Sequence, residues 1–169
     1  MLETLRLHII PLTYPQLLQY IDCDGVLEKG LGLHPAPRTI PPALREALEA
    51  AIIPAVADES KNYLYSTLWT AVLKDENCMA GELCMMGEPN AAGEVEIGYG
   101  IYEAYQNRGL MTEFIQGMVA WLATQLKVKS ILASTEKTNI ASCRVLERNQ
   151  FLKIGEDNEL MHWKLIIRK

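Results

Sequence analysis

Residues 95–112, VEIGYGIYEAYQNRGLMT, constrain the fold more than any other stretch of this chain. From Val95 to Ile101, apolar side chains alternate with glutamate or glycine, which is the period of a β-strand. Glycine is a poor strand former, so Gly98 and Gly100 indicate that a ligand or another backbone comes close there. A loop and a helical pattern follow directly, and the stretch therefore predicts a strand, a loop and a helix start.

The loop Gln106–Gly109 immediately precedes the helical pattern and has the residues of an anion site. The N-terminus of a helix has free N–H groups and a partial positive charge, and both favour phosphate oxygens. Gly109 lets the backbone approach an anion without an intervening Cβ, and Arg108 can add a full positive charge. We therefore expect a phosphate-bearing ligand at this loop.

The bulk composition is that of a globular protein, and the 169 residues predict a single domain spanning residues 1–169. A net charge of -5 argues against broad nucleic-acid binding, and no apolar run approaches the length of a membrane span. Glu3 precedes the short N-terminal apolar run, so we expect no signal peptide and a cytoplasmic location. The 4 cysteines lack metal-type spacing, so we expect them to be reduced and expect no metal site.

Periodicity divides the rest of the chain into strands and helices. The expected strands are Thr4–Ile10, Tyr65–Leu73, Asn77–Met86, Val95–Ile101, Ser130–Ser134, Phe151–Gly155 and Glu159–Ile167. The expected helices are one that begins at Thr13 or Tyr14, then Ala43–Ala57 with an end or a kink at Pro54, then Leu110–Leu126 and Ile140–Asn149. The segment Asp24–Pro42 is rich in glycine and proline, and we expect a loop or a broken helix there.

The helix after Gly109 has one apolar face, formed by Leu110, Phe114, Ile115, Met118, Val119, Leu122 and Leu126. The strand, helix and strand from Val95 to Ser134 should form a right-handed crossover between parallel strands. Asn139 is a good N-cap for the last helix, and Asn149 tolerates the left-handed conformation at its C-terminal end.

Two segments together resemble the GNAT superfamily of N-acetyltransferases. Gln106–Met111 resembles the family's Q/R-x-x-G-x-G/A loop, and Asn139–Phe151 resembles its N-x-x-S/A-x-x-x-x-E…G-F helix. The E-I-G-Y strand, the M-T-E helix start and the N-x-x-S helix are similar to the branch that acetylates ribosomal-protein N-termini and small amines. The resemblance implies a mixed α/β fold, with a mostly antiparallel twisted sheet of about seven strands, a central parallel pair and flanking helices.

The resemblance also implies acetyl-CoA as the donor, with its pyrophosphate at the loop and its pantetheine arm along the end of the fourth strand, where Gly98 and Gly100 would leave room for it. The residues that it places around acetyl-CoA are Tyr99, Gly100, Ile101, Gln106, Asn107, Arg108, Gly109, Leu110, Met111, Thr112 and Asn139. Three positions depart from the family pattern. Met111 replaces a small residue, Gln150 replaces a glycine, and Leu146 replaces a tyrosine that protonates the leaving thiolate in some members.

Acyl transfer to an amine needs a base for the amine proton, N–H donors for the oxyanion and a proton for the leaving thiolate. We expect Glu96 to be the base because it lies on the active strand; the alternative is that Glu94 and Glu96 are solvated charges on the strand face. Ser142 is the candidate proton donor, and Tyr102 or Tyr105 could take that role instead. Ser142 could also be a small residue that allows close helix packing.

The expected function is transfer of an acetyl group from acetyl-CoA to a primary amine, on a protein N-terminus or a small molecule, by direct attack on the thioester. Two alternatives stay open: a non-catalytic acyl-CoA-binding or sensing module on the same fold, and a hydroxyl acceptor. The acceptor pocket is expected between the first helix, the Asp24–Pro42 loop and the last hairpin. A homodimer is compatible with the sequence.

The three histidines are scattered along the chain. His8, His34 and His162 show no arrangement with serine or cysteine that suggests a triad, so we interpret them as ordinary strand and loop residues. His34 lies in the Asp24–Pro42 loop and could line the acceptor pocket.

Overall fold

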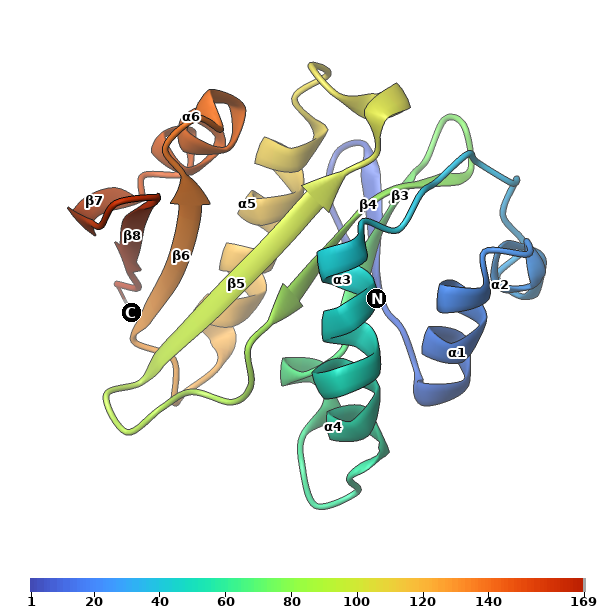
Figure 1. Cartoon of the computed structure of the whole chain (residues 1–169), viewed down its shortest axis with the longest axis horizontal. Helices are drawn as coiled ribbons and strands as arrows, with labels where there is room; N and C mark the ends of the chain where they lie inside the picture. Colours follow the sequence, from blue (N-terminus) through green and yellow to red (C-terminus); the bar gives the residue numbers. More distant parts are fainter. Residues whose placement is uncertain (169) are drawn as a thin grey trace.

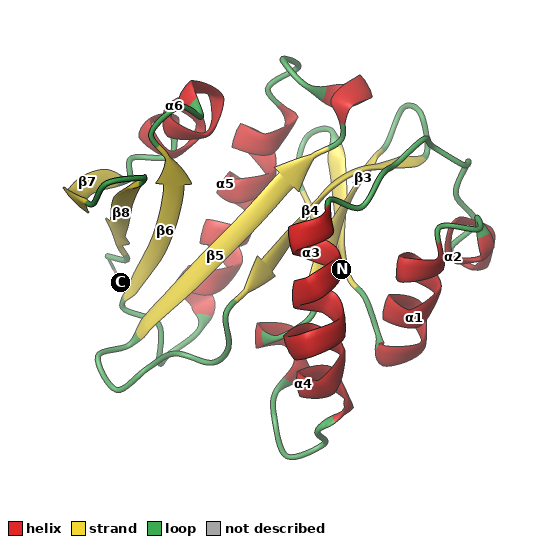
Figure 2. Cartoon of the chain, in the orientation of Figure 1, coloured by secondary structure: helices red, strands yellow, loops and turns green. Residues whose placement is uncertain are grey.

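The computed structural model describes residues 1–168 as one sheet with helices on both faces (Figure 1). The strands, yellow in Figure 2, are β1 (Leu2–Glu3), β2 (Leu7–Pro11), β3 (Leu68–Leu73), β4 (Cys78–Met85), β5 (Glu94–Ile101), β6 (Ser130–Glu136), β7 (Leu152–Glu156) and β8 (Leu160–Ile166). The helices are α1 (Tyr14–Asp22), α2 (Val26–Gly30), α3 (Pro42–Ala47), α4 (Ile53–Ala57), α5 (Leu110–Thr124) and α6 (Ile140–Arg148). Shorter helical turns are η1 (Leu48–Ile52), η2 (Tyr63–Tyr65) and η3 (Glu103–Tyr105). In Figure 1, α3 and α4 lie in front of the sheet and α5 lies behind it.

Within residues 1–168 the sheet has eight strands in the order β1-β2-β3-β4-β5-β6-β8-β7. Neighbouring strands are antiparallel except β5 and β6, which are parallel and joined through α5. This arrangement confirms the expected mixed α/β fold and its central parallel pair. The additional strand is β1, whose two residues pair with β2 and are too few to show a period in the sequence.

The helix expected over Ala43–Ala57 does not end at Pro54. It runs from α3 through η1, which is a π-helical turn, into α4. Proline has no N–H to donate, and a π-helical turn changes the hydrogen-bond spacing just before it, so the helix continues past the residue that was expected to end or kink it. Leu48 and Ile52 are the buried residues of η1.

The Asp24–Pro42 segment contains α2 and an internal buried ion pair, and one member of that pair, Arg38, also contacts α1. Arg38 contacts Glu28, and each side chain is only 3% exposed. Arg38 also donates a 2.8 Å hydrogen bond to the carbonyl of Tyr20 in α1. His34 bonds the carbonyl of Glu76 in the β3–β4 turn at 2.9 Å, so the second half of the segment is fixed both to α1 and to this turn.

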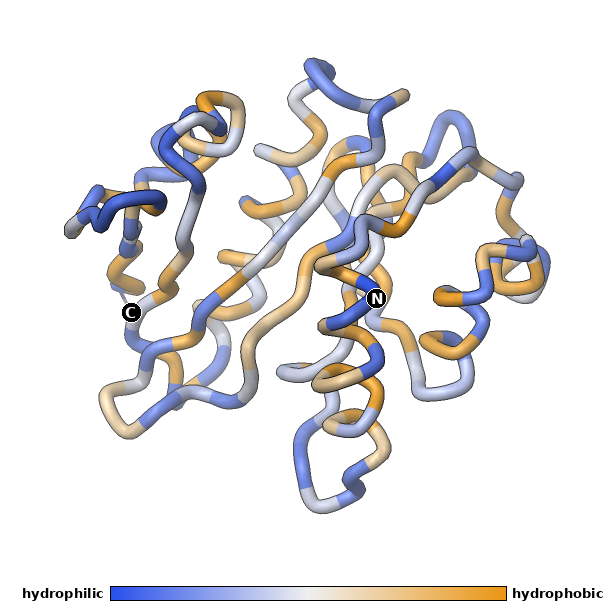
Figure 3. The backbone as a smooth tube through the Cα atoms, viewed as in Figure 1, coloured by the Kyte–Doolittle hydropathy of each residue, from blue (hydrophilic) through white to orange (hydrophobic). Residues whose placement is uncertain are grey.

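Helix α5 packs its apolar face on β2 and β5, and its fully or nearly fully buried residues are Leu110, Met111, Phe114, Ile115, Met118 and Leu122. Gly117 lets the helix approach β2 closely, because a Cβ there would lie 2.7 Å from Ile9 Cδ1. Leu126 was expected on this face, but α5 ends at Thr124 and Leu126 is 90% exposed. Figure 3 shows that hydrophobic residues gather along the central strands, whereas the outer loops are largely hydrophilic.

The turn after α6 also differs from expectation. Gln150, not Asn149, has the left-handed backbone conformation, with φ +64° against −89°. Gln150 therefore adopts a conformation that glycine takes readily. Asn149 instead donates its side-chain amide to the carbonyl of Thr112 at 3.2 Å, which ties α6 to the first turn of α5.

The parallel strands β5 and β6 pair over only part of their length. Pairing runs from Glu94 with Ser130 to Ile97 with Ala133. Beyond that point β5 continues with β4 as its partner, and β6 continues with β8. The two strands diverge toward their C-terminal ends, as Figure 1 shows. The resulting gap in backbone pairing, between residues 98–101 and 134–136, is called the opening below.

Candidate active site

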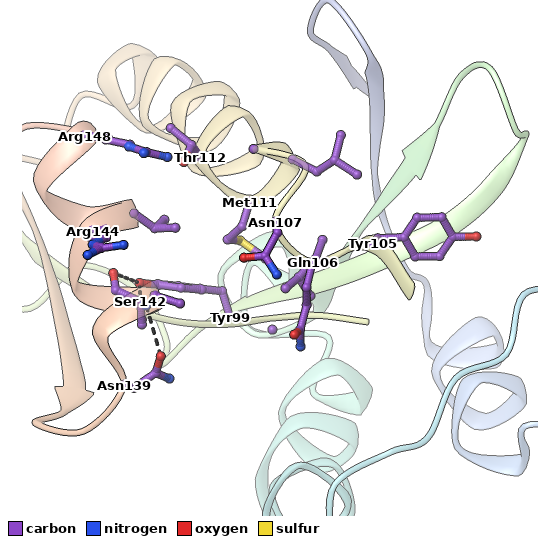
Figure 4. Close-up of a pocket in the computed structure, with 16 residues that line it drawn as sticks. Tyr99, Tyr105, Gln106, Asn107, Met111, Thr112, Asn139, Ser142, Arg144 and Arg148 are labelled. Atoms are coloured by element: carbon purple, nitrogen blue, oxygen red, sulfur yellow. Dashed lines mark hydrogen bonds between the residues drawn. The ribbon is translucent and has the colours of Figure 1, made fainter. Parts of the chain in front are cut away.

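A cleft of about 550 Å³ lies beside the opening, walled by β5, the loop before α5, the first turn of α5 and α6 (Figure 4). Its lining residues are Tyr99, Gly100, Ile101, Tyr105, Gln106, Asn107, Gly109, Leu110, Met111, Thr112, Asn139, Ala141, Ser142, Arg144, Val145 and Arg148. Every residue that the sequence places around acetyl-CoA is part of this lining except Arg108. The structure therefore brings together two segments that are about thirty positions apart in the chain.

The loop at the start of α5 has the backbone shape of an anion site. Asn107 and Gly109 both have left-handed conformations, with φ +59° and +73°, and Gly109 is the N-cap of α5. Left-handed residues within a turn direct successive N–H groups toward one point, and the helix dipole adds positive potential there. The loop thus offers backbone donors without needing a charged side chain.

A polar network fixes this loop to the N-terminal strands. Arg6 donates a 2.9 Å hydrogen bond to the carbonyl of Arg108, and its Nε lies 2.6 Å from a carboxylate oxygen of Glu113 in α5. Thr4 donates a further 2.6 Å hydrogen bond to Glu113. Burial raises the pKa of Glu113, but the hydrogen bonds from Thr4 and Arg6 outweigh it and hold that pKa below its usual value. The carboxylate is therefore charged at neutral pH and keeps Arg6 against the loop.

Positive charge in the cleft comes from residues that the sequence did not single out. The Arg108 guanidinium lies 2.8 Å from Glu76 and over the ring of Tyr105, and it is not part of the lining. Arg144 and Arg148, on one side of α6, line the cleft instead. Neither of these two arginines has a carboxylate partner within residues 1–168. Arg144 and Arg148 are four positions apart, so they share one face of the helix that Asn139 caps. This spacing was the sequence signal that could have identified them.

A substitution at Gly109 tests the loop conformation. A Cβ there would lie 3.6 Å from Arg6 Nη2, which is ordinary contact, so the constraint is the left-handed φ and not lack of space. We expect Gly109→Ala to lower the free energy of unfolding by about 1 kcal/mol and to weaken acetyl-CoA binding, because the loop relaxes. Urea denaturation and calorimetric titration measure the two effects. Gly30→Ala is the control, since it has open space and no left-handed φ, and an equal loss in both variants would contradict this explanation.

Ser142 and Tyr99 form a hydrogen-bonded pair across the cleft. Their hydroxyl oxygens lie 2.7 Å apart, one on α6 and the other on β5. Burial raises the pKa of Tyr99 to about 12, although the hydrogen bond with Ser142 lowers it. Asn139 caps α6 by accepting a 3.0 Å hydrogen bond from the N–H of Ser142, which fixes the serine at the start of the helix. A neutral, proton-bearing pair therefore lines the cleft at neutral pH.

The other candidate proton donors are engaged elsewhere. Leu146 is fully buried and has no proton to give. The hydroxyl of Tyr105 lies 2.9 Å from Cys78 Sγ, and Figure 4 shows it directed away from Ser142 and Tyr99. The hydroxyl of Tyr102 lies 3.3 Å from that of Tyr20 and outside the cleft lining.

Glu96 lies on the opposite face of β5 from the cleft. It is exposed, and Ser134 Oγ lies 3.4 Å from one of its carboxylate oxygens. Ser134 also lies 3.1 Å from His162 Nδ1, and His162 Nε2 lies 3.3 Å from Asp157. The expectation that the histidines have no serine arrangement is therefore wrong for His162. Ser134 lies on β6 and His162 on β8, and their proximity depends on the register between these two strands. Glu94 is paired with Lys164 at 2.7 Å, which lowers the pKa of Glu94.

The glycines of β5 make room for protein side chains on this same face. A Cβ at Gly100 would lie 2.5 Å from Glu82 Oε1, and one at Gly98 would lie 3.1 Å from Met86 Cε. The Glu82 carboxyl of β4 is thus the protein group that a side chain at Gly100 would meet.

Glu82 is the buried acid that sequence reasoning missed. It is 8% exposed, and Tyr20 donates a 3.3 Å hydrogen bond to it. Burial raises the pKa of Glu82 to about 7, and the hydrogen bonds of Tyr20 and Tyr102 only partly oppose this effect. A lone carboxylate inside the apolar run CMAGELCM was the available signal.

No group of three or more His, Cys, Asp or Glu side chains in residues 1–168 is placed to hold a metal ion. No helix in the described part of the chain combines the length and apolarity needed to cross a membrane.

Comparison with known proteins places this geometry in a family. A family model described as "Acetyltransferase (GNAT) domain" matches residues 16–152. The uncharacterized N-acetyltransferase YjdG of Bacillus subtilis (strain 168) is 28% identical over 95 residues, which is 56% of this chain and 56% of that protein. The chain thus matches little more than half the length of this relative.

Two solved structures share the fold along nearly the whole chain. The ribosomal-protein-S5-alanine acetyltransferase of Vibrio fischeri has a TM-score of 0.71 at 16% identity, covering 99% of this chain and 96% of that chain. RimL, a ribosomal L7/L12 alpha-N-protein acetyltransferase solved in complex with coenzyme A, has a TM-score of 0.67 at 19% identity, covering 97% and 96%. Because the family model extends from α1 to the start of β7, this protein belongs to the GNAT acetyltransferase family.

Proposed function

We propose that residues 1–169 act as one acetyltransferase domain that transfers the acetyl group of acetyl-CoA to a primary amine by direct attack on the thioester. The observation that carries the proposal is the cleft beside the opening. It places an anion loop, two arginines without carboxylate partners and a serine–tyrosine pair in one continuous lining. Family membership and the coenzyme A complex of RimL support the same donor.

The residues of the cleft fit acetyl-CoA from its charged end to its thioester. The N–H groups of Gly109 to Thr112 would receive the pyrophosphate, and Arg144 and Arg148 would pair with phosphate oxygens. The pantetheine arm would lie along the edge of β5 beyond Ile97, which has no strand partner on the β6 side. An extended, amide-bearing chain binds such an edge as an added strand would.

The two faces of the opening divide the chemistry between donor and acceptor. Glu96 would take the proton of the attacking amine as the new C–N bond forms. Backbone N–H groups of residues 99–101 would stabilise the oxyanion, and the C–S bond then breaks. Ser142 would give its proton to the leaving thiolate, Tyr99 would return a proton to Ser142 through their 2.7 Å hydrogen bond, and Tyr99 would then recover a proton from water.

The acceptor class follows from charge and from the relatives. Glu96 and Asp157 give the face of the sheet opposite α5 acidic character, whereas Glu94 is already paired with Lys164, and the chain has a net charge of -5. An acidic face favours a cationic amine over a neutral hydroxyl acceptor. RimL is named as an alpha-N-protein acetyltransferase of ribosomal L7/L12, and the Vibrio fischeri enzyme is named for an alanine of ribosomal protein S5, so a free protein N-terminus or a small cationic amine is the proposed acceptor.

A thiol-release assay tests the function. Acetyl-CoA is incubated with peptides that have free N-termini, with polyamines and with acetyl-blocked controls, while a calorimetric titration measures binding of coenzyme A. Release of free thiol that requires an unblocked amine, with a 42 Da gain on the product, is the expected result. Binding without release on any acceptor would favour a sensing module instead. A gain on a hydroxyl would contradict the amine assignment.

We expect Glu96→Gln to lower turnover by about a hundredfold at pH values where the acceptor amine is protonated. The loss should shrink as the pH approaches the value at which the amine is already neutral, because a base is then no longer needed. A pH–rate profile of both enzymes measures this. Glu94→Gln is the matched control, since Glu94 lies two residues earlier on the same face and is paired with Lys164. Parallel profiles for Glu96→Gln and the wild type would remove Glu96 from the mechanism.

A further inference from the structure

Four side chains on the face of the sheet opposite α5 form a continuous hydrogen-bonded array, called here the β6–β8 array. Asp157 Oδ2 lies 3.3 Å from His162 Nε2, and His162 Nδ1 lies 3.1 Å from Ser134 Oγ. Ser134 Oγ in turn lies 3.4 Å from Glu96 Oε1. The array therefore leads from the proposed base to an imidazole and ends at a carboxylate.

The sheet register places one end of this array at the opening. Ser134 pairs with His162 across β6 and β8, and it is the first residue of β6 beyond the last β5–β6 pair. Glu96 lies one residue before that last pair on β5. Asp157 lies in the turn before β8 and accepts hydrogen bonds from the N–H groups of Glu159 and Leu160, both at 2.8 Å, which fix its carboxylate.

The hydroxyl of Ser134 has one proton and two neighbours that can accept it. When His162 is neutral, Ser134 can donate to Nδ1 while Nε2–H donates to Asp157. When His162 is protonated, both ring nitrogens are donors, so Nδ1–H donates to Ser134 and Ser134 donates to Glu96. The direction of the serine hydroxyl therefore couples the charge on His162 to the charge on Glu96.

We propose that the β6–β8 array is a proton relay that clears the amine proton from Glu96 through Ser134 to His162. Glu96 takes the proton of the amine, then passes it to Ser134 Oγ as Ser134 gives its own proton to His162 Nδ1. Asp157 stabilises the resulting imidazolium at Nε2, and His162 finally releases its proton to water. The relay rests on the proposed function, because it restores Glu96 for the next turnover.

Charged side chains also lie two residues from members of the array on the same strand faces: Glu94 on β5, Glu136 on β6 and Lys164 on β8. Glu94 of β5 is paired with Lys164 of β8, so neither is available to His162 as a hydrogen-bond partner. Glu96 approaches from β5 and Asp157 from the turn before β8. A change in the titration of His162 can therefore be assigned to these two carboxylates by substitution.

Nuclear magnetic resonance of the histidine rings tests the coupling without an acceptor, and the chain has only 3 histidines to assign. We expect Glu96→Gln to lower the titration midpoint of His162 by about half a pH unit, because a nearby negative charge is lost. When Ser134 is already replaced by alanine, Glu96→Gln should shift the titration midpoint of His162 by less than half of that amount. His8 is the matched control, since its Nδ1 lies 3.3 Å from Glu3 on the far side of the sheet. An equal shift with and without Ser134 would overturn the relay.

Kinetics supply the second test. Ser134→Ala and His162→Ala should each lower kcat about tenfold and leave the KM for acetyl-CoA within about twofold of the wild-type value. The control variant His8→Gln should be as active as the wild type. Added imidazole should restore turnover to His162→Ala, since a free base replaces the missing one, whereas a purely structural loss would not respond. Unchanged kcat in both variants would refute the relay. A wild type that acetylates no amine would instead contradict the proposed function, and the ring titration would still decide the coupling.

Discussion

The difference in unfolding free energy between Glu82→Gln and the wild type is expected to change by about 3 kcal/mol in favour of the variant as the pH rises from 5 to 9. Burial raises the pKa of Glu82 from 4.5 to about 7. The unfolded chain therefore gives up this proton more readily than the folded protein. Between these two values the unfolded state binds fewer protons, so the stability of the wild type falls as the pH rises through 7.

Glutamine cannot ionise, so the variant lacks this loss and the two stability curves should separate above pH 5. At lower pH both proteins have a neutral side chain at this position, and the curves should lie close together. Urea denaturation at a series of pH values measures the difference. Glu46→Gln removes an exposed carboxylate from α3 and serves as the control. Curves that stay parallel from pH 5 to 9 would show that Glu82 is charged in the fold throughout.

The double charge reversal Arg144→Glu with Arg148→Glu is expected to weaken acetyl-CoA binding by about a hundredfold or more. Both guanidinium groups line the cleft and lack a carboxylate partner in residues 1–168, so they are available to phosphates. A charge-assisted hydrogen bond contributes about 1.5 kcal/mol or more, and reversing the charge adds repulsion to that loss. The effect should decrease at high salt, because exposed charges are screened.

Calorimetric titration with acetyl-CoA at low and high salt measures this prediction. Arg45→Glu is the control, since Arg45 is an exposed arginine on α3 that pairs with Glu49 and lies outside the cleft lining. Equal affinity in the double variant and the wild type would mean that the phosphates lie elsewhere. Arg108→Ala should have a smaller effect than the double variant, since its guanidinium is paired with Glu76.

The local patterns of the sequence predicted the elements that form the cleft. Alternation from Val95 to Ile101 and the glycine before a helical period both report on neighbours in the chain, and such signals can be read from one sequence. The direction of a long side chain cannot be read in this way. Arg108 was expected in the cleft, but Glu76, 32 positions away, holds it outside. Arg144 takes the place that Arg108 was expected to fill.

The same limit applies to the groups that meet across the sheet. Gly100 suggested that a ligand or another backbone comes close, and its close neighbour in the fold is the Glu82 side chain, which the β4–β5 register brings opposite it. Ser134 and His162 are 28 positions apart and become neighbours through the β6–β8 register. Register is set by the whole sheet, so periodicity places these residues on a strand face but does not say which of them touch.

The partial pairing of β5 and β6 has a consequence for the lifetime of the protein in a cell. Beyond Ile97 and Ala133, the facing edges of the two strands have backbone groups that no neighbouring strand satisfies. A bound pantetheine arm would supply those missing hydrogen bonds to the folded state and to no unfolded one. Folding and metabolite binding are then linked equilibria, and the fraction of unfolded chain exposed to proteases rises when acetyl-CoA is scarce. The free energy of unfolding would thus rise with the concentration of acetyl-CoA.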